Sequence, residues 1–429
     1  MSAETSGAIE ERTIPSMRVS GSPSNFSRRA FLSAVCGPVA AAGTRWTQFR
    51  GDGASSVSAD QRLPLEWSDD KNVAWSVATP GYGQSSPVVY GDKVFVTSVE
   101  GAHKETLILA AHNLSAGKNL WMYQGRPGQS IEDSNMISKA APTPAVDADA
   151  VYAFFETGNL AAIDHIGKLK WERQLTKEFG EFGGRHGIGS SVRLCGSGLL
   201  VLVAHDGPSY LLCTDRGTGE TVWKADRPKG VSWSTPSIAE HDGREIALVS
   251  VGKSVDAYDT ADGSLLWTLD GLEGAFIASP TPIAGGAIIG SSRKGHTVAI
   301  RFDPNAKAMP EIVWRATEAA SYFSSPLVHQ SRVYMVSKAG VAFCLDIESG
   351  EEIWRSRLEG PNWASPIGLK DRVYFCGVNG VTEVIEAGTS FTRIARNSLS
   401  EESRLYGTAV AEDCLLLRYG RRLIKVSAG

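Results

Sequence analysis

Four aromatic residues stand at equivalent positions in the chain and are the first candidates for binding chemistry. Trp233, Phe323 and Trp363 each lie two residues before a Ser/Thr-Pro pair that opens a short apolar run, and Tyr406 precedes a similar run by the same distance. Exposed rings bury a large area at a small entropic cost, so they are frequent at binding sites. If the fold gathers them, we expect an arc that grips an extended peptide or stacks on sugar rings. The alternative is that the rings only pack on one another.

A glycine-rich stretch, FGGRHGIG at residues 182–189, holds the basic pair Arg185 and His186. Backbone N–H groups of such a loop can surround an anion. The stretch lacks the GxxxxGK[ST] pattern of a phosphate-binding loop and opens no helical pattern. Arg185 and His186 are therefore candidates for contacts to a partner or ligand, and the missing pattern disfavours phosphate as that ligand.

The residue types of known catalytic and metal sites do not form a recognisable set. Eight histidines are spread along the chain without an H-E-x-x-H pair, and no G-x-S-x-G sequence is present. Beyond residue 45 five cysteines remain, with no C-x-x-C spacing, which favours buried free thiols over a metal site. The sequence therefore offers no catalytic residue and no metal ligand set, and it favours a non-enzymatic role.

One recurring phrase indicates which elements must position the candidate residues. It begins with Asp or Asn, continues through a Gly and ends in Trp, as in DRGTGETVW and DIESGEEIW. Asp or Asn can accept N–H groups two residues on, Gly supplies a positive φ, and Trp provides a broad apolar face with one N–H donor. We therefore interpret the phrase as structural. Its tryptophans are Trp75, Trp121, Trp171, Trp223, Trp267, Trp314 and Trp354.

The spacing of these tryptophans predicts the fold. Successive gaps are 46, 50, 52, 44, 47 and 40 residues, and each holds short alternating runs separated by Gly, Asp or Asn turns. That length fits four strands and their loops, which is one propeller blade. A further unit, residues 365–394, lacks the Trp, and a last unit from Tyr406 to Val426 is one strand short. Residues 72–75 have a Trp but no strands before them.

The economical solution is an all-β, eight-bladed β-propeller of four-stranded antiparallel blades. Its ring is closed by the N-terminal strand at Val73–Trp75, which completes the last blade beside the strand that ends near Val426. Closure removes the exposed sheet edges that would otherwise favour aggregation.

The first 45 residues differ from the rest of the chain. Residues 1–26 are polar and without apolar periodicity, and SRRAFL at residues 27–32 precedes the short apolar stretch SAVCGPVAAAG. Paired arginines before a short apolar segment with small residues at its end are typical of a twin-arginine export signal. We predict a disordered and signal region over residues 1–45, cleaved near 42/43, and a single propeller domain over residues 46–429. The mature protein is then expected in the periplasm.

Composition limits the partners. The chain of 429 residues is 42% hydrophobic and carries a net charge of −4 without a long run of one sign. This disfavours nucleic acid as a partner, and no later segment is long and apolar enough for stable membrane insertion.

The repeated phrase resembles that of the PQQ-like (tryptophan-docking) β-propeller repeat proteins. Their pattern A-x-D-x-x-T-G-x-x-x-W is matched almost fully by CTDRGTGETVW at residues 213–223, and WTQFRGDG at residues 46–53 resembles the leader of exported planctomycete-type members. The resemblance covers residues 46–427 and implies the propeller fold. It leaves function open, because this architecture serves enzymes and scaffolds alike.

The resemblance implies two contrasting functions. Quinoprotein dehydrogenases of this fold bind pyrroloquinoline quinone (PQQ) with calcium, and many stack an adjacent Cys-Cys disulfide on the quinone. This chain has no Cys-Cys pair and few carboxylates where its inner strands begin, so both PQQ and calcium are disfavoured and no cofactor is expected.

The other relative is the propeller lipoprotein of the outer-membrane β-barrel assembly machine, which binds partners without catalysis. Cys36 lies inside the apolar segment and after a poor lipobox, so a lipid anchor is not expected. We therefore expect a binding or scaffold propeller that recognises an envelope protein or an extended polymer at the mouth of its channel. A quinone-dependent oxidoreductase and a carbohydrate-binding propeller are the alternatives.

Overall fold

The computed structural model describes residues 45–57, 62–132, 138–184 and 186–427. The expectations for the export signal and for Arg185 fall on residues outside these ranges. Within them every regular element is a strand except one short helix, α1 (Leu175–Phe179), between the second and third blades. Central strands such as Gly198–Val203 are apolar and fully buried. Trp-bearing outer strands such as Asn119–Gly125 alternate between more and less exposed residues, as expected for a strand with one face packed on the ring.

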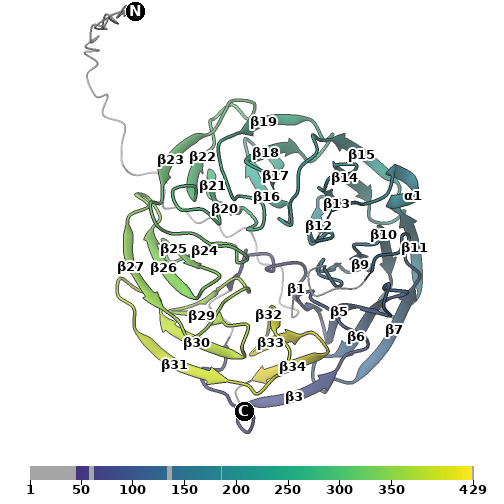
Figure 1. Cartoon of the computed structure of the whole chain (residues 1–429), viewed down its shortest axis with the longest axis horizontal. Helices are drawn as coiled ribbons and strands as arrows, with labels where there is room; N and C mark the ends of the chain where they lie inside the picture. The colour runs from purple at the N-terminus through teal and green to yellow at the C-terminus, as the bar shows by residue number, and fades with distance from the viewer. Residues whose placement is uncertain (1–44, 58–61, 133–137, 185, 428–429) are drawn as a thin grey trace, which may run out of the picture. The chain divides into compact units, whose positions relative to one another are not determined.

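Eight blades, each of four antiparallel strands, are arranged in a ring (Figure 1), and a fifth strand extends two of these sheets. This arrangement confirms the predicted eight-bladed propeller. We number the blades in chain order, each from its inner to its outer strand. Blades one to four are β4 (Val88–Tyr90), β5 (Lys93–Glu100), β6 (Thr106–Asn113), β7 (Asn119–Gly125); β8 (Ala145–Val146), β9 (Val151–Phe154), β10 (Asn159–Ile163), β11 (Leu169–Gln174); β12 (Arg193–Cys195), β13 (Gly198–Val203), β14 (Tyr210–Asp215), β15 (Thr221–Asp226); β16 (Ser237–His241), β17 (Arg244–Val251), β18 (Ser254–Asp259), β19 (Leu265–Leu269). Blades five to eight are β20 (Thr281–Ile283), β21 (Gly286–Ile289), β22 (Val298–Arg301), β23 (Glu311–Arg315); β24 (Leu327–His329), β25 (Arg332–Val336), β26 (Val341–Asp346), β27 (Glu352–Arg357); β28 (Ile367–Leu369), β29 (Arg372–Cys376), β30 (Val381–Glu386), β31 (Arg393–Ser398); β32 (Leu405–Ala411), β33 (Cys414–Tyr419), β34 (Arg422–Ser427), β3 (Val73–Ala78).

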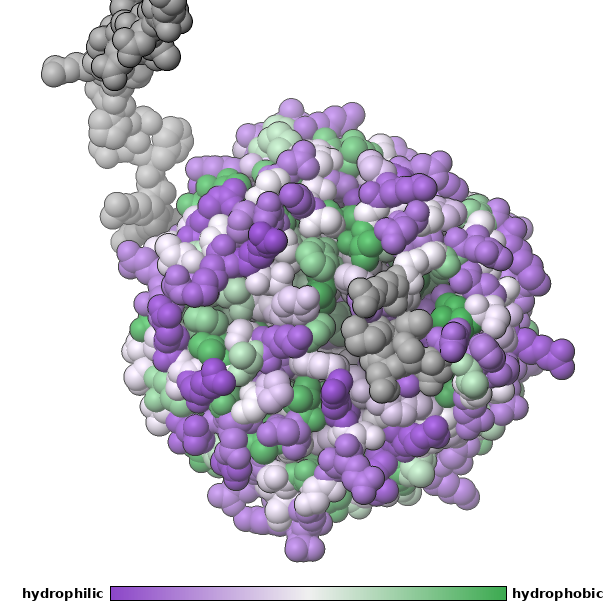
Figure 2. Space-filling view, in the orientation of Figure 1, coloured by the Kyte–Doolittle hydropathy of each residue, from purple (hydrophilic) through white to green (hydrophobic). Residues whose placement is uncertain are grey.

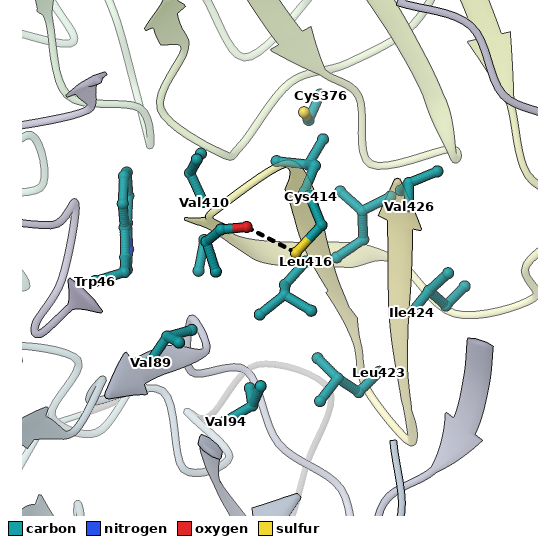
Figure 3. Close-up of a cluster of buried hydrophobic side chains, with 14 of the residues drawn as sticks. Trp46, Val89, Val94, Cys376, Val410, Cys414, Leu416, Leu423, Ile424 and Val426 are labelled. Carbon is teal, nitrogen blue, oxygen red and sulfur yellow. Dashed lines mark hydrogen bonds between the residues drawn. The ribbon is translucent and has the colours of Figure 1, made fainter. Parts of the chain in front are cut away.

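Both ends of the ring contribute to the eighth blade. Strand β3 pairs antiparallel with β34, with Val73 opposite Val426, so the predicted closure is confirmed. Figure 3 shows the core beneath this junction, where Leu416 and Leu423 of the last blade point toward Val89 and Val94 of the first. Apolar packing therefore joins the last blade to the first.

The repeated phrase makes the same turn in successive blades. The carboxylate of Asp215 accepts the N–H groups of Gly217 and Thr218 at 2.9 and 2.8 Å. The carboxylate of Asp346 accepts those of Glu348 and Ser349 in the same way. Each turn lies against the Trp of the preceding blade. A Cβ placed on Gly117, for example, would stand 2.8 Å from the ring of Trp75, so only glycine fits there.

The indole N–H groups of these tryptophans donate to backbone carbonyls of the neighbouring blade. Trp75 donates to Leu114 at 3.0 Å and Trp171 to Arg216 at 2.9 Å. The further pairs are Trp121 with His165, Trp223 with Thr260, Trp314 with Ile347 and Trp354 with Gly388. Each pair joins two adjacent blades at the outer edge of the ring.

Hydroxyl groups make a comparable connection at the inner edge. The N–H of Ser86 donates to the hydroxyl of Thr143 at 3.0 Å, and the N–H of Thr143 donates to the hydroxyl of Ser191 at 2.9 Å. The series continues through Thr235, Ser279, Ser325 and Ser365, one residue from each blade up to the seventh. The Ser/Thr positions that open the inner strands thus form a belt around the channel, and Ser191 supplies the third blade's place although that blade lacks the proline.

Residues 45–57 run through the channel as a plug. Strand β1 (Arg45–Trp46) adds to β4, and β2 (Ser56–Val57) runs parallel to β28. Between them the side chain of Arg50, 6% exposed, donates to the hydroxyl of Thr281 at 3.1 Å and to the carbonyls of Ala54 and Pro326. Burial, and then the charge of Arg193, lower the pKa of Arg50 to about 9. The plug thus ties together blades on both sides of the channel.

The five cysteines of the described residues, Cys195, Cys213, Cys344, Cys376 and Cys414, are buried free thiols, as the sequence predicted. Burial raises the pKa of Cys414 to about 11, which keeps it as an unreactive thiol at neutral pH. Among the described helices, none has the length and apolar character needed to cross a bilayer.

Candidate functional site

The loops that lead into the inner strands bring three of the four predicted aromatic residues into one row. The ring centroids of Phe323 and Trp363 are 4.8 Å apart, and those of Trp363 and Tyr406 are 5.9 Å apart. These residues come from blades six, seven and eight. Each of them stands two residues before the Ser/Thr that opens its inner strand. Equivalent positions of neighbouring blades lie side by side in the ring, so these side chains form a row.

Two further tyrosines extend this row. Tyr82, which precedes β4, lies 6.1 Å from Tyr406, and their hydroxyl oxygens are 2.6 Å apart in a hydrogen bond. At the other end Tyr322 packs edge-on against Phe323 at 4.8 Å. We call the five residues Tyr322, Phe323, Trp363, Tyr406 and Tyr82 the aromatic arc. The arc spans blades six, seven, eight and one.

The arc is only partly buried. Phe323, Trp363, Tyr406 and Tyr82 are half-buried, and the side chain of Tyr322 is 39% exposed. Burial, followed by the hydrogen bond to Tyr406, raises the pKa of Tyr82, so the Tyr82 hydroxyl stays protonated at neutral pH. Packing of ring on ring, one of the two expectations, therefore occurs here together with an exposed outer edge.

Trp233 lies apart from the arc. Its ring contacts His186 at 5.9 Å and Phe276 at 6.1 Å, and its indole N–H donates to the carbonyl of Gly187 at 2.9 Å. A Cβ on Gly189 would lie 2.8 Å from this indole. The glycine-rich stretch therefore serves as the support of Trp233, and of its predicted basic pair the structure places His186 against that ring.

A pocket of 590 Å³ opens beside Trp233, between the loops of blades three, four and five. Its walls combine the rings of Trp233 and Phe276, the backbone of several glycines and a set of charged side chains. Glu273 lies between two cations, with Lys253 Nζ at 3.2 Å and Arg293 Nη1 at 2.7 Å, and these contacts lower its pKa. Asp206 is an exposed carboxylate on another wall. A ring-shaped ligand with polar substituents fits such a lining.

His205 closes the inner side of this pocket as a neutral imidazole. Its Nδ1 accepts the N–H groups of Gly183 and Gly207 at 3.1 and 2.7 Å, so its proton resides on Nε2. Burial lowers the pKa of His205, which keeps the ring uncharged at neutral pH. The imidazole therefore fixes the loop geometry of the pocket.

A buried ion pair fixes the loop that follows β7 at the mouth. Lys104 Nζ lies 2.7 Å from Glu156 Oε1, with both side chains fully buried, and Lys104 also donates to the carbonyl of Ser138. Glu156 accepts the N–H of Ala140 at 2.9 Å. The described end of this loop, next to Tyr82, is therefore rigidly placed.

The described residues offer no metal centre. No group of three or more His, Cys, Asp or Glu side chains within them could hold an ion. The channel is occupied by Arg50 and the plug.

Sequence reasoning missed three members of the mouth. Tyr82 and Tyr322 stand outside the register two residues before the hydroxyl, and Phe276 is one residue removed from it. All three lie in loops without periodicity, so only their proximity to a Ser-Pro pair could have indicated them. Figure 2 shows one face of the ring, with hydrophobic residues in green scattered among hydrophilic ones in purple. A partner on such a face needs apolar and polar contacts together.

Comparison with known proteins agrees with this fold. A family model described as outer membrane protein assembly factor BamB matches residues 40–185, 184–305 and 306–392. The outer membrane protein assembly factor BamB of Shewanella oneidensis is 23% identical over 276 residues, which are 63% of this chain and 63% of that protein. The chain thus spans less than two thirds of that relative's length.

Solved structures share the architecture at low identity. BamB from Moraxella catarrhalis aligns with a TM-score of 0.61 at 15% identity, over 83% of this chain and 97% of that one. Quinohemoprotein alcohol dehydrogenase from Comamonas testosteroni aligns with a TM-score of 0.60 at 11% identity, over 89% and 80%. At such identities the likeness shows the fold alone.

Proposed function

The chain belongs to the PQQ-like propeller family described as outer membrane protein assembly factor BamB, and from this premise we propose that it is a non-enzymatic, protein-binding scaffold of the bacterial cell envelope. Relatives carry the name of an assembly factor, which supports a role in binding other proteins. The site proposed for that role is the mouth of the channel, and its most prominent element is the aromatic arc.

The observation that carries this proposal is the unbroken row of ring contacts across four consecutive blades. Blade packing does not require this row, because the outer tryptophans and the hydroxyl belt already join the blades. Half-exposed aromatic residues are the side chains that contribute most to protein interfaces. An extended segment of a partner protein is the occupant that a curved row of this kind fits best.

Affinity capture from a bacterial envelope extract tests the proposal. The wild-type chain is expected to retain a defined envelope protein, and the Phe323→Ala/Trp363→Ala variant is expected to lose it by about tenfold or more, as for hot-spot residues. Ile166→Ala is the matched control, because Ile166 is 80% exposed on the turn between β10 and β11 of blade two, which contributes no residue to the arc. Equal capture by all three proteins would refute a role of the mouth.

Location in the periplasm is part of the proposal. It rests on the paired arginines and short apolar segment before residue 45 and on the name of the relatives. Fractionation of cells that express the full chain, with and without Arg28→Lys/Arg29→Lys, tests it. Accumulation of the wild type in the cytoplasm would contradict it.

A carbohydrate-binding propeller is the second candidate, and the pocket beside Trp233 favours it. An indole face with charged hydrogen-bonding groups around it is suited to a sugar ring. A glycan array with wild type and Trp233→Ala separates this function from the first. Binding that persists in Trp233→Ala would remove the pocket as its site.

We propose no cofactor. The quinone-dependent oxidoreductase is tested by adding pyrroloquinoline quinone and calcium to the purified chain and recording the quinone absorbance after removal of unbound ligand. Stoichiometric uptake would overturn the scaffold proposal.

A further inference from the structure

Basic side chains lie over the rings of the aromatic arc. The Nζ of Lys338 is 5.2 Å from the ring centre of Tyr322 and 5.4 Å from that of Phe323. The guanidinium of Arg404 lies 5.0 Å from the ring of Trp363. Tyr82 has Lys139 at 5.1 Å and Arg421 at 6.0 Å. A cation thus accompanies the arc from blade six to blade one.

Three of these cations have no carboxylate partner among the described residues. Lys338, Arg404 and Arg421 are exposed, and their cationic groups lie over the aromatic rings. The neighbouring Arg422 shows the contrast, because its guanidinium pairs with Glu401 at 3.1 Å. The net charge of the chain is −4, so this cluster is a local reversal of the protein's charge.

A cation over an aromatic face in water gains only about 0.5–1 kcal/mol. Its N–H groups remain able to donate to an incoming carboxylate, and the ring beneath limits the side-chain entropy that is lost when they do so. Charge-assisted hydrogen bonds of arginine to carboxylates are among the stronger interactions at interfaces. The arc therefore presents paired apolar and cationic elements in a fixed order.

The dimensions of the arc suit an extended chain. Three ring-to-ring steps of 4.8, 5.9 and 6.1 Å lead from Phe323 to Tyr82. Such a distance corresponds to roughly five residues of an extended strand, whose side chains alternate in direction. Acidic and apolar residues of such a strand would reach the cations and the rings.

We propose that the aromatic arc recognises an acidic, extended segment of a partner protein, in which carboxylates meet Lys338, Arg404 and Arg421 and apolar side chains lie against the rings. This inference rests on the proposed scaffold function and specifies the chemistry of its partner.

The test uses two fluorescent peptides of about ten residues, one alternating glutamate and phenylalanine and one alternating lysine and phenylalanine, titrated with the full chain. We expect the acidic peptide to bind at least about tenfold more tightly. Its Kd should rise roughly tenfold between about 50 and 300 mM salt, because exposed charges are screened at the higher concentration. Equal binding of the two peptides would overturn the proposal.

Variants locate the effect on the arc. Lys338→Gln/Arg404→Gln is expected to weaken the acidic peptide about tenfold, and Arg421→Gln to weaken it several-fold. The matched control Arg422→Gln, next in sequence and already paired with Glu401, is expected to stay within about twofold of wild type. Unfolding temperatures of all four proteins are compared first, and they are expected to agree because the changed side chains are at the surface.

A wild-type affinity in both arc variants would also overturn the proposal. If those variants still lose nothing while Phe323→Ala/Trp363→Ala loses the envelope protein, the scaffold function stands and the acidic partner is wrong. If no envelope protein depends on the rings, the scaffold function itself fails.

Discussion

Arg50 in the channel and Arg404 at its mouth are the same side chain in opposite settings. Arg50 is 6% exposed and gives its N–H groups to carbonyls and hydroxyls of the plug and of two blades. Arg404 is exposed and lies over the ring of Trp363 without an ion pair among the described residues. In the channel the guanidinium of Arg50 donates to groups of the protein itself, whereas at the mouth the N–H groups of Arg404 remain able to bind another molecule. This difference separates the part of the molecule that maintains the ring from the part that is available to a partner.

Replacing each of the two arginines by alanine should give the largest difference in the free energy of unfolding. Arg50→Ala removes the donor for Thr281 and for the carbonyls of Ala54 and Pro326, and it leaves a cavity, so we expect a loss of about 3 kcal/mol in the free energy of unfolding. Arg404→Ala should change it by less than about 0.5 kcal/mol. Urea unfolding followed by circular dichroism measures both. Similar losses in the two variants would erase the distinction between interior and mouth.

Two glycines sharpen the comparison at the level of packing. Gly368 pairs with Ser56 of the plug, and a Cβ there would stand 2.6 Å from Cγ of His329. We expect Gly368→Ala to cost about 2–3 kcal/mol through overpacking. Gly252 at the pocket has φ +63° but nothing within 4 Å of an added Cβ, so Gly252→Ala should cost about 1 kcal/mol of backbone strain. Unfolding midpoints compare them, and a larger loss at Gly252 would contradict the packing described for the plug.

Acid should destabilise the folded ring. Burial lowers the pKa of His112, His205 and His329 below the ordinary 6.5. The unfolded chain takes up protons near 6.5 while the folded chain does so only at lower pH, so stability is full above that value and falls as the pH decreases through this window. We expect a lower unfolding temperature at about pH 5 than at about pH 7.5.

Part of this pH effect comes from His329, which contacts the plug. Its Nε2 donates to the carbonyl of Lys370 at 2.7 Å, and its Nδ1 accepts from the hydroxyl of Ser56 at 3.1 Å, a bond that protonation removes. His329→Gln should therefore show a smaller difference between the two pH values. An unfolding temperature that does not change with pH, or that rises in acid, would contradict the burial of these rings.

The repeat and the closure could be predicted from the sequence because each blade solves the same packing problem with the same residues. The spacing from Trp75 to Trp354 counts blades, and the incomplete unit at Tyr406–Val426 needs the strand at Val73. The plug could not be predicted, since residues 45–57 have no period, and Arg50 finds its acceptors only after the ring has formed. Three rings of the arc followed from their register. We expected Trp233 to join them. The equivalent position of the fifth blade is Ile277, which is not aromatic, so the row is interrupted there and Trp233 packs against His186 and Phe276 instead.

The junction of β3 and β34 also constrains how the protein is made. The guanidinium of Arg422 donates to the hydroxyl of Ser76 across 346 positions of the chain, so the ring cannot close until the ribosome has delivered its final strand. Throughout translation β3 has a bare backbone edge with no partner of its own. Loss of the six residues of β34 would therefore open two edges at once, and it would cost the chain its circular cooperativity rather than a single strand.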